Sequence, residues 1–199
     1  VGYVTNDFRL VSVESIDTNT ANNSGSLLTA IFRNGSATYL EPAGYTGRTN
    51  SPWLGTILSG LTVLEDFEDG ALVNGVTGTA DQILEPGTAT DSVDADDGTL
   101  DGFGTNGHSA FSSNAVTGIT FTFNSNILGA LPTAAGLVWT DGGGAVIFEG
   151  FGPDGRSLGT FGTFGTTGGS VRSANDLFFG VTNPPGISAI RVNSPSGAI

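Results

Sequence analysis

The residues best suited to chemistry lie in an acidic, glycine-containing tract that runs from Asp91 to Gly104. Like charges packed this closely repel one another unless a cation lies among them, and hard oxygen ligands on a loop are those that calcium prefers. No lysine occurs anywhere in the chain. We therefore predict a calcium site, with ligands from this tract and from a neighbouring acidic turn: Asp91, Asp94, Asp96, Asp97, Asp101 and Asp69.

The spacing within the tract does not match an EF-hand, whose loop needs glycine at its sixth position and glutamate at its twelfth. Counted from Asp94, the glycine comes one position early at Gly98, and Thr105 stands where the glutamate is needed. We expect an irregular loop site; a solvated acidic loop without metal is the alternative. Zinc is disfavoured because the chain has one histidine and no cysteine, and magnesium because it prefers to keep its waters.

A second acidic stretch, Glu65-Asp66-Phe67-Glu68, is similar to the catalytic strand of some jelly-roll glycosidases. That chemistry needs carboxylates at alternate positions on one face of a strand, and here two of them are adjacent. The Gly-x-Ser-x-Gly pattern at 155–159 is followed by no helical pattern, which a nucleophile elbow requires. His108, the single histidine, is expected to be structural. We predict that the protein is not an enzyme.

Two tryptophans could stack on sugar rings. Trp139 lies in the apolar run Leu137-Val138-Trp139 and is expected to pack in the core. Trp53 lies in a loop and is the candidate for an exposed sugar platform. A calcium-dependent, lectin-like module that binds a surface polysaccharide is therefore the alternative function.

The composition argues against two kinds of binding partner. The net charge is −13, and the six basic residues are scattered arginines, so nucleic acid and anionic membrane surfaces are disfavoured. The sequence contains no run of about 18 apolar residues, the length that a membrane-spanning helix needs. The chain has no methionine and begins with Val1, from which we expect a secreted protein whose signal peptide has been removed.

The pattern of short apolar runs between glycine and proline turns predicts strands rather than helices. The run Asp141-Gly142-Gly143-Gly144 is expected to join its two flanking strands as a hairpin. The fold class is all-β: a jelly-roll-like antiparallel β-sandwich over 36–199, preceded by an N-terminal strand arm over 1–35. Strands are expected at 8–13, 27–32, 61–67, 108–111, 118–124, 135–140, 145–150, 177–182 and 187–192.

The N-terminal arm carries an amphipathic strand, and the unpaired edge of a sheet is a template for another strand. Donation of this strand to a neighbouring copy would give an open fibre rather than a closed ring. The alternative is that it completes its own sheet. The apolar residues of this assembly strand are Phe8, Leu10, Val11 and Val13.

From about Tyr39 onward the chain resembles secreted bacterial proteins that carry a C-terminal PEP-CTERM sorting signal. The blocks behind this resemblance are Leu64 to Gly70, Ser92 to Gly98, Gly118 to Phe123, Leu137 to Gly142, Leu177 to Val181 and Gly186 to Ile190. The resemblance does not cover residues 1–35, and the chain stops at Ile199 without the sorting tail.

The resemblance implies export and retention at the cell surface or in the extracellular matrix. Together with the residues above, it leads us to expect a calcium-stabilised structural protein whose partner is a further copy of itself.

Overall fold

A computed structural model describes residues 37–45, 47–55, 62–85, 92–93, 107–140, 144–166 and 176–195. The chain divides into two units, 1–35 and 36–199. The whole of the first unit lies outside the described residues, and with it the predicted strands at 8–13 and 27–32. The second unit holds all the elements that follow.

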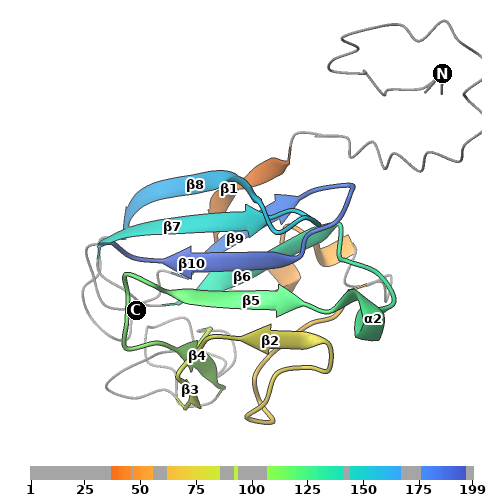
Figure 1. Cartoon of the computed structure of the whole chain (residues 1–199). Helices are drawn as coiled ribbons and strands as arrows, with labels where there is room; N and C mark the ends of the chain where they lie inside the picture. The colour runs from red at the N-terminus through yellow and green to blue at the C-terminus, as the bar shows by residue number, and fades with distance from the viewer. Residues whose placement is uncertain are drawn as a thin grey trace, which may run out of the picture. The chain divides into compact units, whose positions relative to one another are not determined.

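The regular elements of the described part of the chain are almost all antiparallel β-strands (Figure 1). A three-stranded sheet has the order β1 (Thr38–Gly44), β9 (Leu177–Thr182), β6 (Ala134–Trp139). A five-stranded sheet has the order β2 (Val76–Gly78), β5 (Ile119–Phe123), β10 (Ala189–Asn193), β7 (Gly144–Phe151), β8 (Ser157–Thr166). A small sheet pairs β3 (Gln82–Leu84) with β4 (Ser109–Phe111), and the helical turns are η2 (Arg48–Asn50) and α2 (Ser125–Leu128).

The two larger sheets pack face to face around one apolar core. In β5 the side chains alternate, so Ile119 and Phe121 are buried while Thr122 is exposed. Phe148 of the larger sheet and Phe179 of the smaller are both fully buried, with ring centroids 5.9 Å apart. The prediction of an all-β, sandwich-like fold is thus confirmed; the jelly-roll connectivity stays a prediction.

The predicted hairpin between residues 135–140 and 145–150 is wrong. Both strands form, as β6 and β7, but β6 pairs with β9, and β7 pairs with β8 and β10. Trp139 and Phe148 belong to the same core from opposite layers. The chain therefore crosses from the smaller sheet to the larger one between β6 and β7. The apolar faces of the two strands are buried against each other across the core as well as they would be side by side in a hairpin.

The predicted strand at 61–67 is also wrong in its described part, 62–67, which forms no strand. The Glu65 carboxylate accepts the Phe67 backbone N–H, and Phe67 has a φ of 63°, so the backbone cannot continue a ladder. Conversely, β1 and β8 were not predicted. Pro42 interrupts the pattern of β1, and β8 is rich in glycine and threonine, so each depends on its neighbouring strand.

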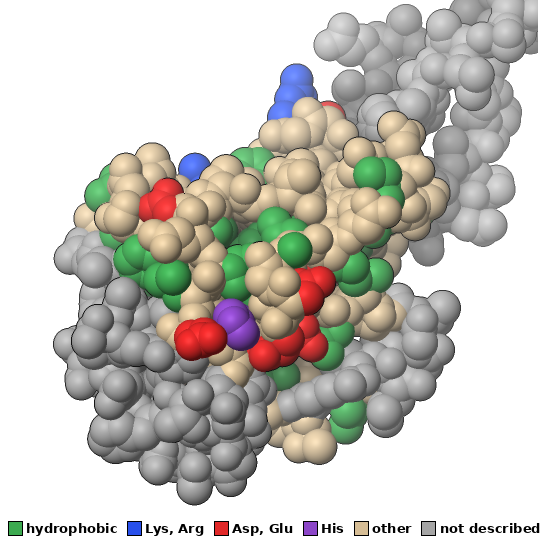
Figure 2. All heavy atoms as spheres, turned by 90° about the horizontal axis from the view of Figure 1, so that it is seen from below, with side chains coloured by type: hydrophobic (Ala, Val, Ile, Leu, Met, Phe, Trp, Pro, Cys, Tyr) green, Lys and Arg blue, Asp and Glu red, His purple; other side chains and the backbone are tan. Residues whose placement is uncertain are grey.

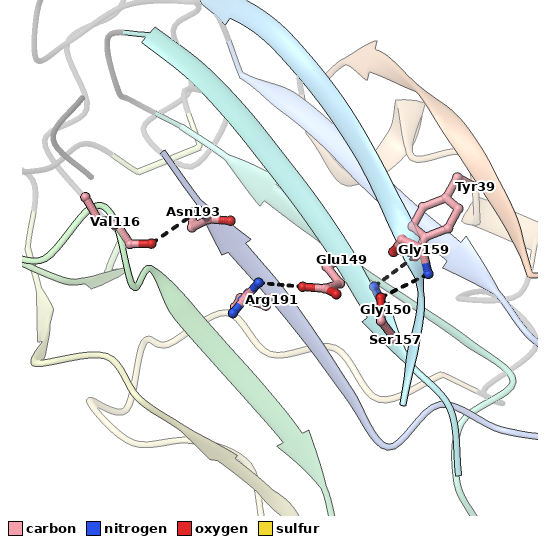
Figure 3. A network of polar contacts seen from close by, with 8 residues as sticks. All are labelled: Tyr39, Val116, Glu149, Gly150, Ser157, Gly159, Arg191 and Asn193. Carbon is pink, nitrogen blue, oxygen red and sulfur yellow. Dashed lines mark hydrogen bonds and ion pairs between the residues drawn. The ribbon is translucent and has the colours of Figure 1, made fainter. Parts of the chain in front are cut away.

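Tyr39 ties the two layers together (Figure 3). Its hydroxyl donates to the carbonyl of Gly159 in β8 and accepts the N–H of Gly150 in β7 at 3.0 Å. Its ring stacks on Phe161 at 5.8 Å and meets Phe148 edge-on at 6.0 Å. Burial is the main reason that the pKa of Tyr39 is raised above its ordinary value of 10.0.

We expect the stability of the fold to decline at alkaline pH through Tyr39. Because its pKa is higher in the folded state, the unfolded chain ionises first, so stability is full below pH 10.0 and falls above it. Tyr39→Phe should cost about 1–3 kcal/mol at neutral pH, by leaving the two backbone groups unpaired, and should flatten the alkaline decline. Urea melts between pH 8 and 11 measure both effects. Tyr45→Phe is the control. If the free energy of unfolding of Tyr39→Phe declines with pH as steeply as that of the wild type, Tyr39 is not the group responsible for the alkaline decline.

A glycine at the start of β5 is required for close packing against β10. Gly118 has a φ of +68°, and a Cβ there would lie 2.0 Å from the carbonyl oxygen of Val192. Gly129 has a φ of +83° but open space around it. Gly129→Ala should therefore cost only the strain of the left-handed backbone, about 1–2 kcal/mol, and Gly118→Ala should cost distinctly more. If thermal melts show that the two variants lose equal stability, the close contact of Gly118 with β10 does not require glycine.

Candidate functional site

Four of the acidic residues that the structure describes lie within one short segment, and one of them, Glu68, contacts the single histidine. We call this group the acidic cluster: Glu65, Asp66, Glu68, Asp69 and His108. Figure 2 shows the histidine with acidic side chains on either side of it on one face of the molecule. The segment that carries the four carboxylates is anchored by Phe67, whose ring lies 6.2 Å from that of Phe121 in β5.

Glu65 holds its segment in shape. One carboxylate oxygen accepts the N–H of Phe67 at 2.7 Å, and the other accepts the N–H of Val73 at 2.5 Å. The side chain thus closes the turn-containing stretch between residues 65 and 73. Both oxygens are engaged by backbone donors, which is a structural use of the carboxylate rather than the arrangement of a free acid or nucleophile.

The two aspartates form local turns. Asp66 accepts the N–H of Glu68 at 3.2 Å, and Asp69 accepts the N–H of Ala71 at 2.9 Å. Each contact uses Oδ1, and among the described residues no hydrogen bond engages Oδ2 of these exposed aspartates. Asp69 was the one predicted calcium ligand from outside the acidic tract.

His108 connects this segment to β4. Its Nδ1 lies 3.3 Å from Oε2 of Glu68, with the histidine side chain 25% exposed and the glutamate 48%. Gly107, directly before it, is buried, and Ser92, near the start of the acidic tract, is fully buried. The structure therefore describes residues near both ends of the tract and brings His108, which follows the tract, beside the turn that carries Asp69.

Apart from residues 92–93, the tract lies outside the described residues, and so do the predicted ligands Asp91, Asp94, Asp96, Asp97 and Asp101. Within the described part of the chain, no three histidine, aspartate or glutamate side chains come together as a metal site. The calcium site stays a prediction that depends on the tract. Of the predicted ligands the structure describes only Asp69, which directly follows the Glu68 that contacts His108.

Trp53, the candidate sugar platform, packs on the smaller sheet. Its ring meets Phe178 edge-on, with centroids 5.1 Å apart at 83°, and it is half-buried. A Cβ on Gly180 would lie 3.0 Å from the same ring. Trp53 therefore covers a glycine of β9, and only part of its surface remains for a ligand. Trp139, in contrast, is 5% exposed and lies in the core, as predicted.

Two polar contacts of the sheets were not predicted. Asp81 accepts both the N–H and the hydroxyl of Ser113 at 2.7 Å, and these bonds, the backbone one first, lower the pKa of Asp81. Arg191 donates to Glu149 at 2.6 Å, directly across the β10–β7 pair (Figure 3). Its guanidinium also lies over the ring of Phe151. From the alternation of Ile190 and Val192, the sequence could have predicted that Arg191 lies on the outer face of the sheet. Nothing in the sequence indicates that Glu149 is its partner.

Comparison of the chain with protein-family models, curated proteins and solved structures gives no match. Among the described residues, no helix has the length and apolar character needed to cross a membrane. The evidence for function therefore comes from the chemistry of the residues themselves.

The role of Glu65 can be tested by removing its charge. We expect Glu65→Gln to lower the free energy of unfolding by about 1–2 kcal/mol, because a neutral amide accepts two N–H groups less well than a carboxylate. Glu85→Gln is the matched control, since Glu85 is an exposed residue at the end of β3. Urea melts at pH 7 measure both. Equal losses in the two variants would mean that Glu65 does not hold the segment.

Proposed function

We propose that the protein is a secreted, non-enzymatic structural component of the cell surface or extracellular matrix. Calcium held by the acidic tract stabilises it, and copies assemble through their N-terminal strands. Export follows from the resemblance to PEP-CTERM proteins, and the acidic, lysine-free composition is compatible with it.

The observation that carries this proposal is the use of Glu65. It belongs to the one acidic stretch whose sequence offered a hydrolytic alternative, and both its carboxylate oxygens accept backbone N–H groups. Glu68 in the same stretch is paired with His108, which is the single histidine of the chain and so the only imidazole that could act as a general base. The groups available for hydrolysis are thus engaged in holding loops to the sandwich, which favours a structural role.

Calcium binding is supported by the placement of Asp69 and by charge. The chain carries a net charge of −13, and the tract concentrates several of its carboxylates in a short stretch with the buried residues Ser92 near its start and Gly107 after its end. A cation that binds only the folded chain would relieve this repulsion and stabilise the fold. Such binding contributes about 2.7 kcal/mol when the cation is at a hundredfold excess over its dissociation constant.

The test compares the full-length protein in millimolar calcium, in equal magnesium and in chelator. We expect chelation to lower the melting temperature, with magnesium failing to restore it. We also expect negative-stain electron microscopy to show fibres whose number grows with protein concentration in calcium.

An unchanged melt in chelator would remove calcium from the proposal. Monodisperse particles at every concentration would remove assembly, and screening against glycans would then examine the lectin-like alternative. Binding that is lost in Trp53→Ala and retained in Trp53→Phe would support that alternative.

A further inference from the structure

Within the described residues, the two larger sheets end in four strands: β1 and β6 in the smaller sheet, β2 and β8 in the larger. The outer edge of such a strand offers unpaired N–H and C=O groups to any other strand. Proteins protect such edges by making them short, by bending them with bulges, or by placing proline or charge on them. The four edges can therefore be compared by these features.

Three of the four edges are protected. β2 has only three residues. β1 contains Pro42, which has no N–H, and its register with β9 shifts between Leu40 and Ala43. β8 shifts its register against β7 at two places and includes Gly159 and Gly162 at φ values of 108° and 131°. Each would interrupt a further strand laid beside it.

The edge of β6 has none of these features. Its six residues, Ala-Ala-Gly-Leu-Val-Trp, include no charge and no proline, and they pair with β9 in an unbroken register from Ala134 to Trp139. The Asn183 N–H donates to the Thr133 carbonyl, so alternate residues from Thr133 onward bond to β9. The backbone groups of Ala134, Gly136 and Val138 consequently face outward. The side chains of Ala135 and Trp139 hold the strand in the core.

The N-terminal segment of the chain has the composition and length to fill this edge. Residues 8–13 carry an amphipathic strand pattern whose alternation slips by one from Leu10 to Val13, and 1–35 form a unit separate from the sandwich that they precede. This unit is close to neutral, with Arg9 and Arg33 against three acids, whereas most of the net charge of −13 lies in 36–199. A near-neutral strand can approach an acidic body that would repel a second acidic body.

Its reach also suits a neighbouring copy. Residues 14–37, between the predicted strand and β1, can extend to about 80 Å, while a domain of this size has a radius of gyration of about 15 Å. We infer that the outer edge of β6 accepts residues 8–13 of a second copy as an added antiparallel or parallel strand. This inference rests on the proposed function, because it names the surface through which copies assemble.

The experiment maps the contact directly and needs no assumed register. The chain has no cysteine, so Thr133→Cys, at the exposed residue before β6, gives one site for a benzophenone label. The labelled full-length protein is mixed with nitrogen-15-labelled wild type, irradiated and analysed by mass spectrometry, while sedimentation velocity measures assembly. We expect cross-links from position 133 to residues 1–35 of the other isotopic copy. Val116→Cys, at a site that is 66% exposed away from β6, should give none.

Variants of the edge complete the test. Val138→Pro removes one outward N–H, and Val138→Lys places a charge on the same strand. Each should reduce assembly by about tenfold, the equivalent of one hydrogen bond. Circular dichroism identifies any variant that fails to fold. The remaining folded variant then shows whether assembly depends on the edge of β6.

The outcomes separate this inference from the proposed function. Assembly with cross-links that avoid 1–35, or assembly unaffected by both Val138 variants, overturns the β6 edge and leaves the structural role standing. Cross-links only within one isotopic copy show that the strand completes its own sheet, which also overturns the inference. Absence of both assembly and cross-links removes the proposed function and the inference together.

Discussion

The packing of Phe148 against Phe179 is the interaction on which the rest of the sandwich depends. These two rings are fully buried, one in each of the larger sheets, and their contact sets the two layers face to face. Tyr39 adds a polar tie at the same interface, since its ring touches Phe148 while its hydroxyl bonds to the backbone of β7 and β8. Specific bonding thus accompanies apolar burial at the point where the sheets meet.

The acidic cluster depends on this packing indirectly. Phe67 packs against Phe121 of the larger sheet, and Glu65 folds its own segment around that anchor by accepting two backbone N–H groups. The contact of Glu68 with His108 then joins the segment to β4. An apolar contact therefore positions the carboxylates, and Glu65 and Glu68 in turn hold the segment 65–73 and link it to His108.

The sequence predicts those parts of the fold in which burial and alternation agree. β5, with Ile119 and Phe121 inward, and β9, with its continuous apolar run, form close to the predicted residues. It could not predict which strands pair, because Trp139 and Phe148 are equally apolar and the hairpin and the crossing bury them alike. β8 was missed because its glycine-rich pattern gains strand structure only from the ladder with β7. At the candidate site, acidic residues were recognised by type, but the partners of Glu65 come from backbone geometry that composition does not encode.

The pairing of β1 with β9 has a consequence for how the chain folds. Thr38 lies opposite Thr182, so the smaller sheet joins the beginning of the described region to its end. β9 is also the only described partner of β6, so neither β1 nor β6 can join a ladder of that sheet before β9 is present. Contacts so distant in sequence close slowly, because the chain loses much entropy before they form. The smaller sheet therefore completes late, because β1 and β6 lack their described partner until β9 (Leu177–Thr182) has left the ribosome.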